Sequence, residues 1–178
     1  QSLRPSIKHS YIYPMDSTTL AKTLIDAFPF EPTGAQEEAL HAMASFFDDE
    51  SAEAVFVLKG YAGTGKTTLI GALVKSIAKL RYKTVLMAPT GRAAKVMAAY
   101  ANRAACTIHK RIYVTQQERQ GNLKFKLQKN KFKRTLFLVD EASMIAKQQQ
   151  QSKLLENGAL LHDLIEYVRS GEDCKLMF

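Results

Sequence analysis

A glycine-rich stretch between two apolar segments restricts the folds that are open to this chain. Residues 60–68 have the sequence GYAGTGKTT, in which two glycines separated by four residues precede Lys-Thr. The apolar run 54–58 before this stretch predicts a buried strand, and the Ala/Leu/Ile-rich run 67–80 after it predicts a helix. Strand, loop and helix in this order are the context in which such a pattern forms a phosphate-binding loop.

The residue types of the loop explain how it would hold a nucleotide. Glycines let successive backbone N–H groups point at phosphate oxygens, and the helix start adds unpaired donors and a positive dipole end. We expect Lys66 to bridge the β- and γ-phosphates and the Thr67 hydroxyl to ligate Mg²⁺. The predicted nucleotide-binding residues of the loop are Gly60, Ala62, Gly63, Thr64, Gly65, Lys66, Thr67 and Thr68, the last without an assigned role.

A second chemical signature is an apolar run that ends in two acids. Residues 135–139 predict a strand, and Asp140 and Glu141 follow it. Because the chain turns at a strand end, Asp140 can reach the magnesium ion held by Thr67, while Glu141 can polarise a water beside the γ-phosphate. We therefore predict hydrolysis, with Lys66, Asp140 and Glu141 as catalytic residues. Residues 130–133 resemble a guanine-reading motif, but its last residue is Lys133, which cannot accept hydrogen bonds from guanine. Guanine specificity is therefore not expected.

The strand, loop and helix order occurs a second time. Residues 84–88 predict a strand, and an Ala- and Met-rich helix follows up to about residue 101. This alternation predicts an α/β fold with a mostly parallel sheet, helices on both faces, and ligands at the carboxyl ends of the strands. The connection Pro89, Thr90, Gly91 and Arg92 would lie on that functional edge, where Arg92 suits an anion contact.

Gln36 has two interpretations. In the first, Thr33 and Gln36 form a capping box at the start of a helix that presents Leu40, Met43 and Phe47 on one face. In the second, the Gln36 amide both donates to and accepts from an adenine edge. The two roles are compatible. A shorter helix is predicted earlier, capped by Asp16 or Ser17 and ended by Pro29.

A lysine-rich segment, residues 116–134, predicts a protruding hairpin with its turn at Gly121-Asn122. Lys124, Lys126 and Lys131 belong to a basic set interleaved with Phe125 and Phe132, which suits a phosphate backbone and stacked bases. The alternative is a solvated edge whose lysines only prevent aggregation.

Composition narrows the partners. The 178 residues suffice for one domain, and a net charge of +8 points to a polyanion such as nucleic acid or an anionic membrane surface. No apolar run approaches the roughly 20 residues that span a bilayer, so we expect no membrane insertion and a cytoplasmic location. The two cysteines lack a CxxC pair and the four histidines lack metal-ligand spacing. The apolar end at 174–178 is typical of a strand just begun, which indicates a fragment.

The ordered set of motifs resembles the first RecA-like motor domain of superfamily 1 DNA helicases, closest to the RecD-like group of the exodeoxyribonuclease V alpha-chain type. The matching stretches are 33–36, the Walker A loop 60–67, 88–94, 107–109, and the Walker B segment 139–143. The resemblance implies adenine reading by Gln36 and contact of Pro89, Thr90, Gly91, Arg92, Thr107 and His109 with single-stranded DNA. It also implies ATP and Mg²⁺ as cofactors, 5′-to-3′ translocation, and a role in recombination or repair.

The resemblance also sets the expected organisation. It makes residues 1–31 an arm with a short helix, and residues 32–178 a P-loop motor domain of three layers with an inserted basic hairpin, incomplete at its C-terminus. Relatives continue into a second motor domain whose arginines complete the ATP site, so the chain alone should have little activity. We expect a monomer in the full-length protein, with partner subunits left open. The alternative is a basic P-loop switch module that recruits partners without unwinding.

Overall fold

A parallel sheet forms the centre of the computed structural model, which describes residues 16–49, 51, 54–117, 123–145 and 160–178. Its strand order is β1-β7-β6-β2-β3, and every pairing is parallel. The strands are β1 (Val55–Phe56), β2 (Lys83–Ala88), β3 (Ala105–Thr107), β6 (Lys133–Val139) and β7 (Glu172–Met177). The predicted α/β architecture is therefore confirmed.

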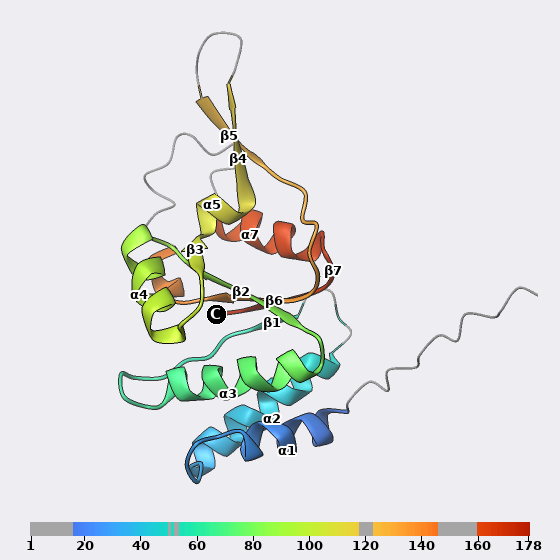
Figure 1. The fold of residues 1–178 in the computed structure, drawn as a ribbon. Coiled ribbons are helices and arrows are strands. Elements are labelled where there is room, and N and C mark those ends of the chain that lie inside the picture. The colour runs from blue at the N-terminus through green and yellow to red at the C-terminus, as the bar shows by residue number, and fades with distance from the viewer. Residues whose placement is uncertain (1–15, 50, 52–53, 118–122, 146–159) are drawn as a thin grey trace, which may run out of the picture.

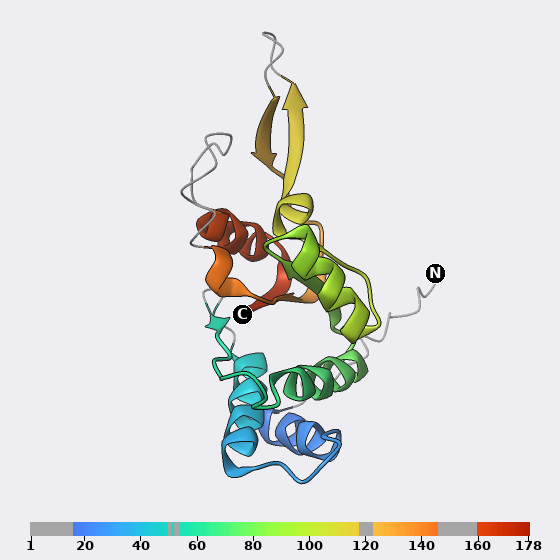
Figure 2. The same ribbon diagram turned by 90° about the vertical axis from the view of Figure 1, so that its left-hand side faces the viewer.

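Helices cover both faces of this sheet (Figure 1). On one side lie α1, α2 and α3, and on the other α5 and α7, while Figure 2 shows α4 running beside the sheet. Their bounds are α1 (Ser17–Asp26), α2 (Gly34–Asp48), α3 (Lys66–Lys79), α4 (Gly91–Ala101), α5 (Ile108–Ile112) and α7 (Leu160–Arg169).

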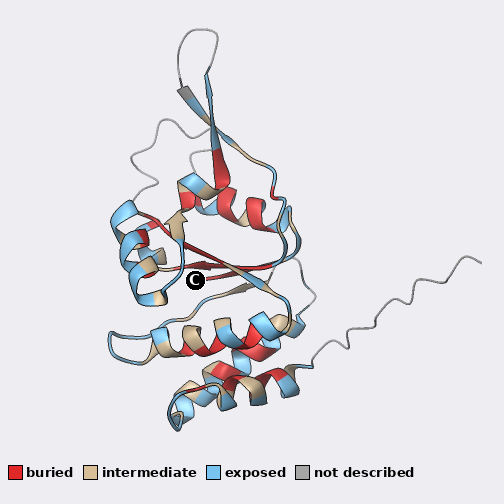
Figure 3. Cartoon of the chain, in the orientation of Figure 1, coloured by how far each residue is buried: buried red, intermediate tan, exposed pale blue. Residues whose placement is uncertain are grey.

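A separate hydrophobic core lies on each face of the sheet, and Figure 3 marks the buried positions along the chain. Strand side chains alternate between faces, so neighbours in β6 enter different cores: Leu136 and Leu138 lie in the first, Phe137 and Val139 in the second. The first core also takes in the α1 residues Leu20, Ala21 and Leu24. The division at residue 31 stays a prediction, but α1 packs in the same core as α2 and α3.

The strand before the loop is shorter and less buried than its apolar sequence predicts. Only Val55 and Phe56 form β1, both are partly exposed, and Val57 is 55% exposed. The reason is position, because β1 lies at the edge of the sheet and pairs on one side with β7. The final strand, in contrast, is longer than its sequence predicts. Instead of a strand just begun, β7 has six residues and pairs with both β1 and β6.

A separate antiparallel pair forms the predicted hairpin, which extends away from α5 and α7 (Figure 1). Its strands are β4 (Tyr113–Gln117) and β5 (Leu123–Leu127), with Tyr113 opposite Leu127. The hairpin therefore starts three residues earlier than the lysine-rich composition indicates. The predicted turn at 121–122, like the predicted irregular arm 1–14, lies outside the described residues.

The remaining predicted helices form close to the expected bounds. Asp16 caps α1 by accepting the Thr19 N–H at 2.6 Å. In α7, Leu160, Leu164 and Val168 are buried at helical spacing. Within the described part of the chain, no helix has the length and apolar character needed to cross a membrane.

Candidate active site

The phosphate-loop residues 60–65 connect β1 to the start of α3. Gly63 and Gly65 have φ angles of +80° and +87°, a region that side chains disfavour. A Cβ on Gly60 would lie 2.7 Å from Thr64 Oγ1, so the loop also closes too tightly for a side chain there. These three positions explain why the loop requires glycine.

The start of α3 suits an anion. Its N-cap is Gly65, which supplies no side-chain acceptor to the first N–H groups of the helix. Uncapped N–H groups and the positive end of the helix dipole are the usual means of binding phosphate. The loop and the helix start together thus have the donor chemistry that a nucleoside triphosphate needs.

Lys66, the first residue of α3, extends back along the loop. Its Nζ donates to the carbonyl oxygens of Gly60 and Tyr61 at 2.5 and 2.7 Å. The ammonium group therefore lies against the loop rather than in bulk solvent. Tyr61 itself is 89% exposed.

Gln36 joins the start of α2 to the loop. Its Oε1 accepts the Thr33 N–H at 3.0 Å, and Thr33 Oγ1 accepts the Gln36 N–H at 3.4 Å, which confirms the capping box. Its Nε2 donates to the Thr64 carbonyl at 3.2 Å, and a Cβ on Gly65 would lie 2.7 Å from this nitrogen. The amide thus serves the cap and also contacts the loop, while adenine recognition stays a prediction.

Asp140 and Glu141 follow β6, and the chain turns there as predicted. The Asp140 N–H still donates to the Met87 carbonyl of β2 at 3.0 Å. Glu141 then takes a φ of +56°, uncommon for a side-chain-bearing residue, and precedes a short 3₁₀ helix, Ala142–Met144. This turn interrupts the alternation of the strand, and Glu141 is exposed.

Asp140 has a partner that the motifs do not predict. Its Oδ2 accepts a hydrogen bond from the Tyr100 hydroxyl of α4 at 2.6 Å. Burial, followed by this hydrogen bond, raises the pKa of the Tyr100 phenol above its ordinary value, so the phenol stays a donor. Tyr100 and Thr67 both line one cavity between α3 and α4. Hydroxyl and carboxylate oxygens are the donors that Mg²⁺ prefers.

The predicted DNA contacts of the first connection lie at the carboxyl end of β2. Thr90 caps α4 by accepting the Ala93 N–H at 3.1 Å, and both Gly91 and Arg92 are exposed in its first turn. Pro89, by contrast, is buried and offers little surface to a nucleic acid.

The second predicted contact region lies at the end of β3. Thr107 caps α5 by accepting the Lys110 N–H at 3.2 Å, and its own side chain is partly exposed. The His109 ring lies 5.7 Å from that of Tyr113, and burial lowers the pKa of His109. His109 is therefore a neutral, half-buried side chain at neutral pH.

The basic segment does not form one surface, contrary to the sequence expectation. Lys124 and Lys126 are exposed on β5. Lys133 and Arg134 instead begin β6, at the amino ends of the strands of the main sheet. There Lys133 pairs with Glu172, and Arg134 lies 3.7 Å from Asp173. The sequence could not show these acids, because they come from a distant strand. Lys131 is exposed just before β6 and so lies on that side.

The phenylalanines of the segment also differ from the expectation. Phe125 packs beside Tyr113 with ring centroids 6.1 Å apart, and Phe132 packs edge-on against Phe137 at 5.5 Å. Both are partly buried and pack against the second hydrophobic core, while base stacking stays a prediction. Asn130 is likewise structural, since it is buried and accepts the Phe132 N–H at 2.8 Å.

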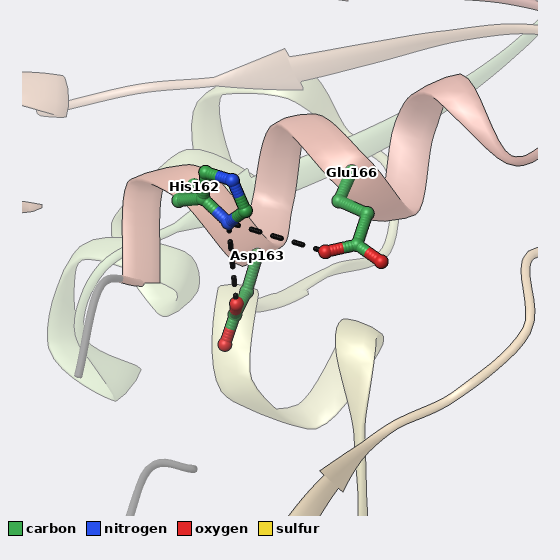
Figure 4. Close-up of side chains that lie close together, drawn as sticks. All are labelled: His162, Asp163 and Glu166. Atoms are coloured by element: carbon green, nitrogen blue, oxygen red, sulfur yellow. Dashed lines mark ion pairs between the residues drawn. The ribbon is translucent and has the colours of Figure 1, made fainter. Parts of the chain in front are cut away.

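One histidine of α7 lies beside two carboxylates, a grouping that the histidine spacing in the sequence does not indicate. The ligand atoms of His162, Asp163 and Glu166 lie within 4.8 Å of one another (Figure 4). His162 Nδ1 is 3.8 Å from Asp163 Oδ1 and 3.9 Å from Glu166 Oε2, the distances of ion pairs. Asp163 is buried and accepts a hydrogen bond from the Tyr113 hydroxyl at 2.5 Å. Asp163 therefore joins α7 to β4, while the His162 and Glu166 side chains are exposed.

Comparison with known proteins agrees with this geometry. The family model described as "AAA domain" matches residues 43–165, more than half of the chain, and the chain therefore belongs to that family. The "ATP-dependent RecD2 DNA helicase" of Deinococcus radiodurans is 31% identical over 115 residues, which cover 64% of this chain and 15% of the helicase. The predicted P-loop fold and the resemblance to RecD-like helicases are confirmed. The chain spans less than two thirds of that relative's length.

Proposed function

We propose that this chain is the ATP-binding and ATP-hydrolysing motor domain of a DNA helicase that moves along single-stranded DNA. One observation carries the proposal. The carboxyl ends of the parallel strands β1, β6 and β2 bring the phosphate loop, Asp140 and Glu141, and the exposed Arg92 to one edge of the sheet. An ATP site and a DNA contact at the same edge of the sheet are what a motor needs to couple ATP hydrolysis to movement along DNA.

Each residue has a chemical role in this proposal. The loop amides and Lys66 bind the phosphates of ATP, and Thr67 and Asp140 would hold Mg²⁺, which neutralises charge on the transferred phosphoryl group. Glu141 orients the attacking water and accepts its proton. Gln36 contacts the adenine edge with the part of its amide that the cap leaves available.

The proposed contacts with single-stranded DNA are predicted residues that are exposed or partly exposed. Gly91 and Arg92, with Thr107 and His109 near the end of β3, would contact the strand. Lys124 and Lys126 on the hairpin would add phosphate contacts. From the resemblance to RecD-like helicases we also propose 5′-to-3′ movement and a role in recombination or repair. We further propose that the full-length protein is a cytoplasmic monomer.

ATP turnover by the full-length protein, with and without single-stranded DNA, tests the proposal. A motor should hydrolyse ATP faster when the strand is present, and a Lys66→Ala variant should lose both rates. A basic P-loop switch that only recruits partners should bind ATP with the same turnover in both conditions. Equal rates would therefore favour the switch.

A further inference from the structure

Tyr100 connects α4 to the aspartate that follows β6. It lies near the end of α4, and its hydroxyl donates to Asp140 Oδ2 at 2.6 Å. The other carboxylate oxygen, Oδ1, accepts the Glu141 N–H at 2.9 Å. Two different parts of the fold thus fix the orientation of one carboxylate.

Packing alone does not explain this side chain. Tyr100 is 45% exposed, whereas Ala94 and Met97 are the buried residues of the same helix. The ring lines the cavity of about 580 Å³ between α3 and α4, and Thr67 lines it too. Tyr100 therefore lines the same cavity as one predicted magnesium ligand and is hydrogen-bonded to the other.

We infer that Tyr100 is a positioning residue that holds the Asp140 carboxylate in the orientation needed for magnesium binding. The inference rests on the proposed nucleotide site. Mg²⁺ demands near-octahedral oxygen geometry, so a carboxylate free to rotate is a poorer ligand. Each carboxylate oxygen has two lone pairs, and a hydrogen bond from Tyr100 leaves one on Oδ2 available.

The chain offers a matched pair of variants. Tyr100→Phe removes the hydroxyl but keeps the ring in the cavity. Tyr82→Phe removes a similar contact, because the Tyr82 hydroxyl donates to Asp173 Oδ1 at 2.5 Å. Tyr82 precedes β2 and Asp173 is the second residue of β7, so this control lies at the amino ends of the strands, away from Asp140.

The measurement is binding of methylanthraniloyl-ATP to the 178-residue chain at increasing magnesium concentration. Tyr100→Phe should raise the half-saturating magnesium concentration about tenfold, the usual effect of losing a hydrogen bond to a ligating carboxylate. Tyr82→Phe should leave it unchanged. Binding in EDTA should be the same for the native chain and Tyr100→Phe, because the hydroxyl affects the nucleotide only through the metal. The thermal unfolding midpoint should fall by a similar small amount in both tyrosine variants, since each loses one hydrogen bond to a carboxylate.

The outcomes separate this inference from the proposed function. If the native chain binds the analogue with no magnesium dependence, the proposed site itself fails, and the inference fails with it. If the native chain shows the dependence and Tyr100→Phe matches it or binds magnesium more tightly, only the inference is overturned. Equal weakening by both tyrosine variants would also overturn it, since the effect would then be general destabilisation.

Discussion

At the scale of single residues, Lys66 is the side chain on which nucleotide affinity depends most. Its ammonium group lies against the Gly60 and Tyr61 carbonyls, beside the place where the loop amides converge. Lys66→Ala removes the positive charge expected to face the β- and γ-phosphates, and we expect affinity for ATP to fall about 100-fold. A titration of labelled ATP measures this.

Lys59 provides the control for Lys66. It is an exposed lysine just before the loop, so Lys59→Ala changes the net charge equally without touching the phosphates. Its affinity should stay within about twofold of the native value. Unchanged affinity in Lys66→Ala would show that residues 60–68 do not bind a triphosphate.

Substitution of Glu141 should impair ATP turnover, whereas substitution of Lys66 impairs ATP binding. Glu141→Gln keeps the shape of the side chain and leaves the Asp140 carboxylate in place, but the amide cannot accept a proton from water. Nucleotide binding should survive, and ATP turnover by the full-length protein should fall about 100-fold or more. Steady-state hydrolysis and equilibrium binding check the two parts separately. A loss of binding that parallels the loss of turnover would mean that Glu141 holds the metal or the fold.

Sequence motifs identify residues whose spacing is local, and they miss those that the fold brings together. Lys66 and Asp140 are recognisable because a loop or a strand end fixes their neighbours. Tyr100 is not, because its contact with Asp140 depends on β6 lying next to β2, the strand that precedes α4. Lys133 and Arg134 illustrate the same limit, since their acidic partners lie in β7.

At the scale of elements, α2 begins with a cap that also contacts the phosphate loop. Gln36→Glu keeps an acceptor for the Thr33 N–H but loses the Nε2 donor to Thr64, whereas Gln36→Ala loses both. We expect Gln36→Ala to lower the free energy of unfolding by about 1 kcal/mol. Gln36→Glu should change this free energy by only about 0.3 kcal/mol. Chemical denaturation measures the difference.

The same two variants test adenine recognition. An adenine edge needs one donor and one acceptor from the amide, which neither Glu nor Ala supplies. Both variants should therefore lose the preference for ATP over GTP in a competition experiment. If the preference is kept while Gln36→Ala is less stable, Gln36 is a cap and a loop contact only.

Element prediction works where local chemistry decides and fails where position in the sheet decides. Asp16 and Thr33 act as N-caps, as their types and the following helical patterns predict. Thr90 and Thr107 are also N-caps in the structure. The apolar run 54–58 gives no sign that β1 lies at an edge. Apolar sequence shows that a strand can be buried, but strand order determines whether it is covered.

At the scale of the whole molecule, the sheet separates the basic side chains into two groups. Lys124 and Lys126 are on the hairpin, while Lys133 and Arg134 are at the amino end of β6 beside acids of β7. The basic side chains behind the net charge of +8 therefore do not all lie on one surface that a single strand of DNA could contact. We expect a polyanion to bind the lysines of the hairpin rather than the basic residues at the amino end of β6.

Binding of single-stranded DNA at increasing salt tests this division. Each phosphate contact contributes about −0.7 to the slope of log affinity against log salt concentration. The double variant Lys124→Ala/Lys126→Ala should bind more weakly and reduce the magnitude of the slope by about 1.4. The control Lys133→Ala also removes an exposed lysine, but one that pairs with Glu172, and its slope should match that of the native chain. If Lys133→Ala changes the slope and the double variant does not, the strand runs along the opposite edge, and the hairpin lysines only keep β5 from aggregating.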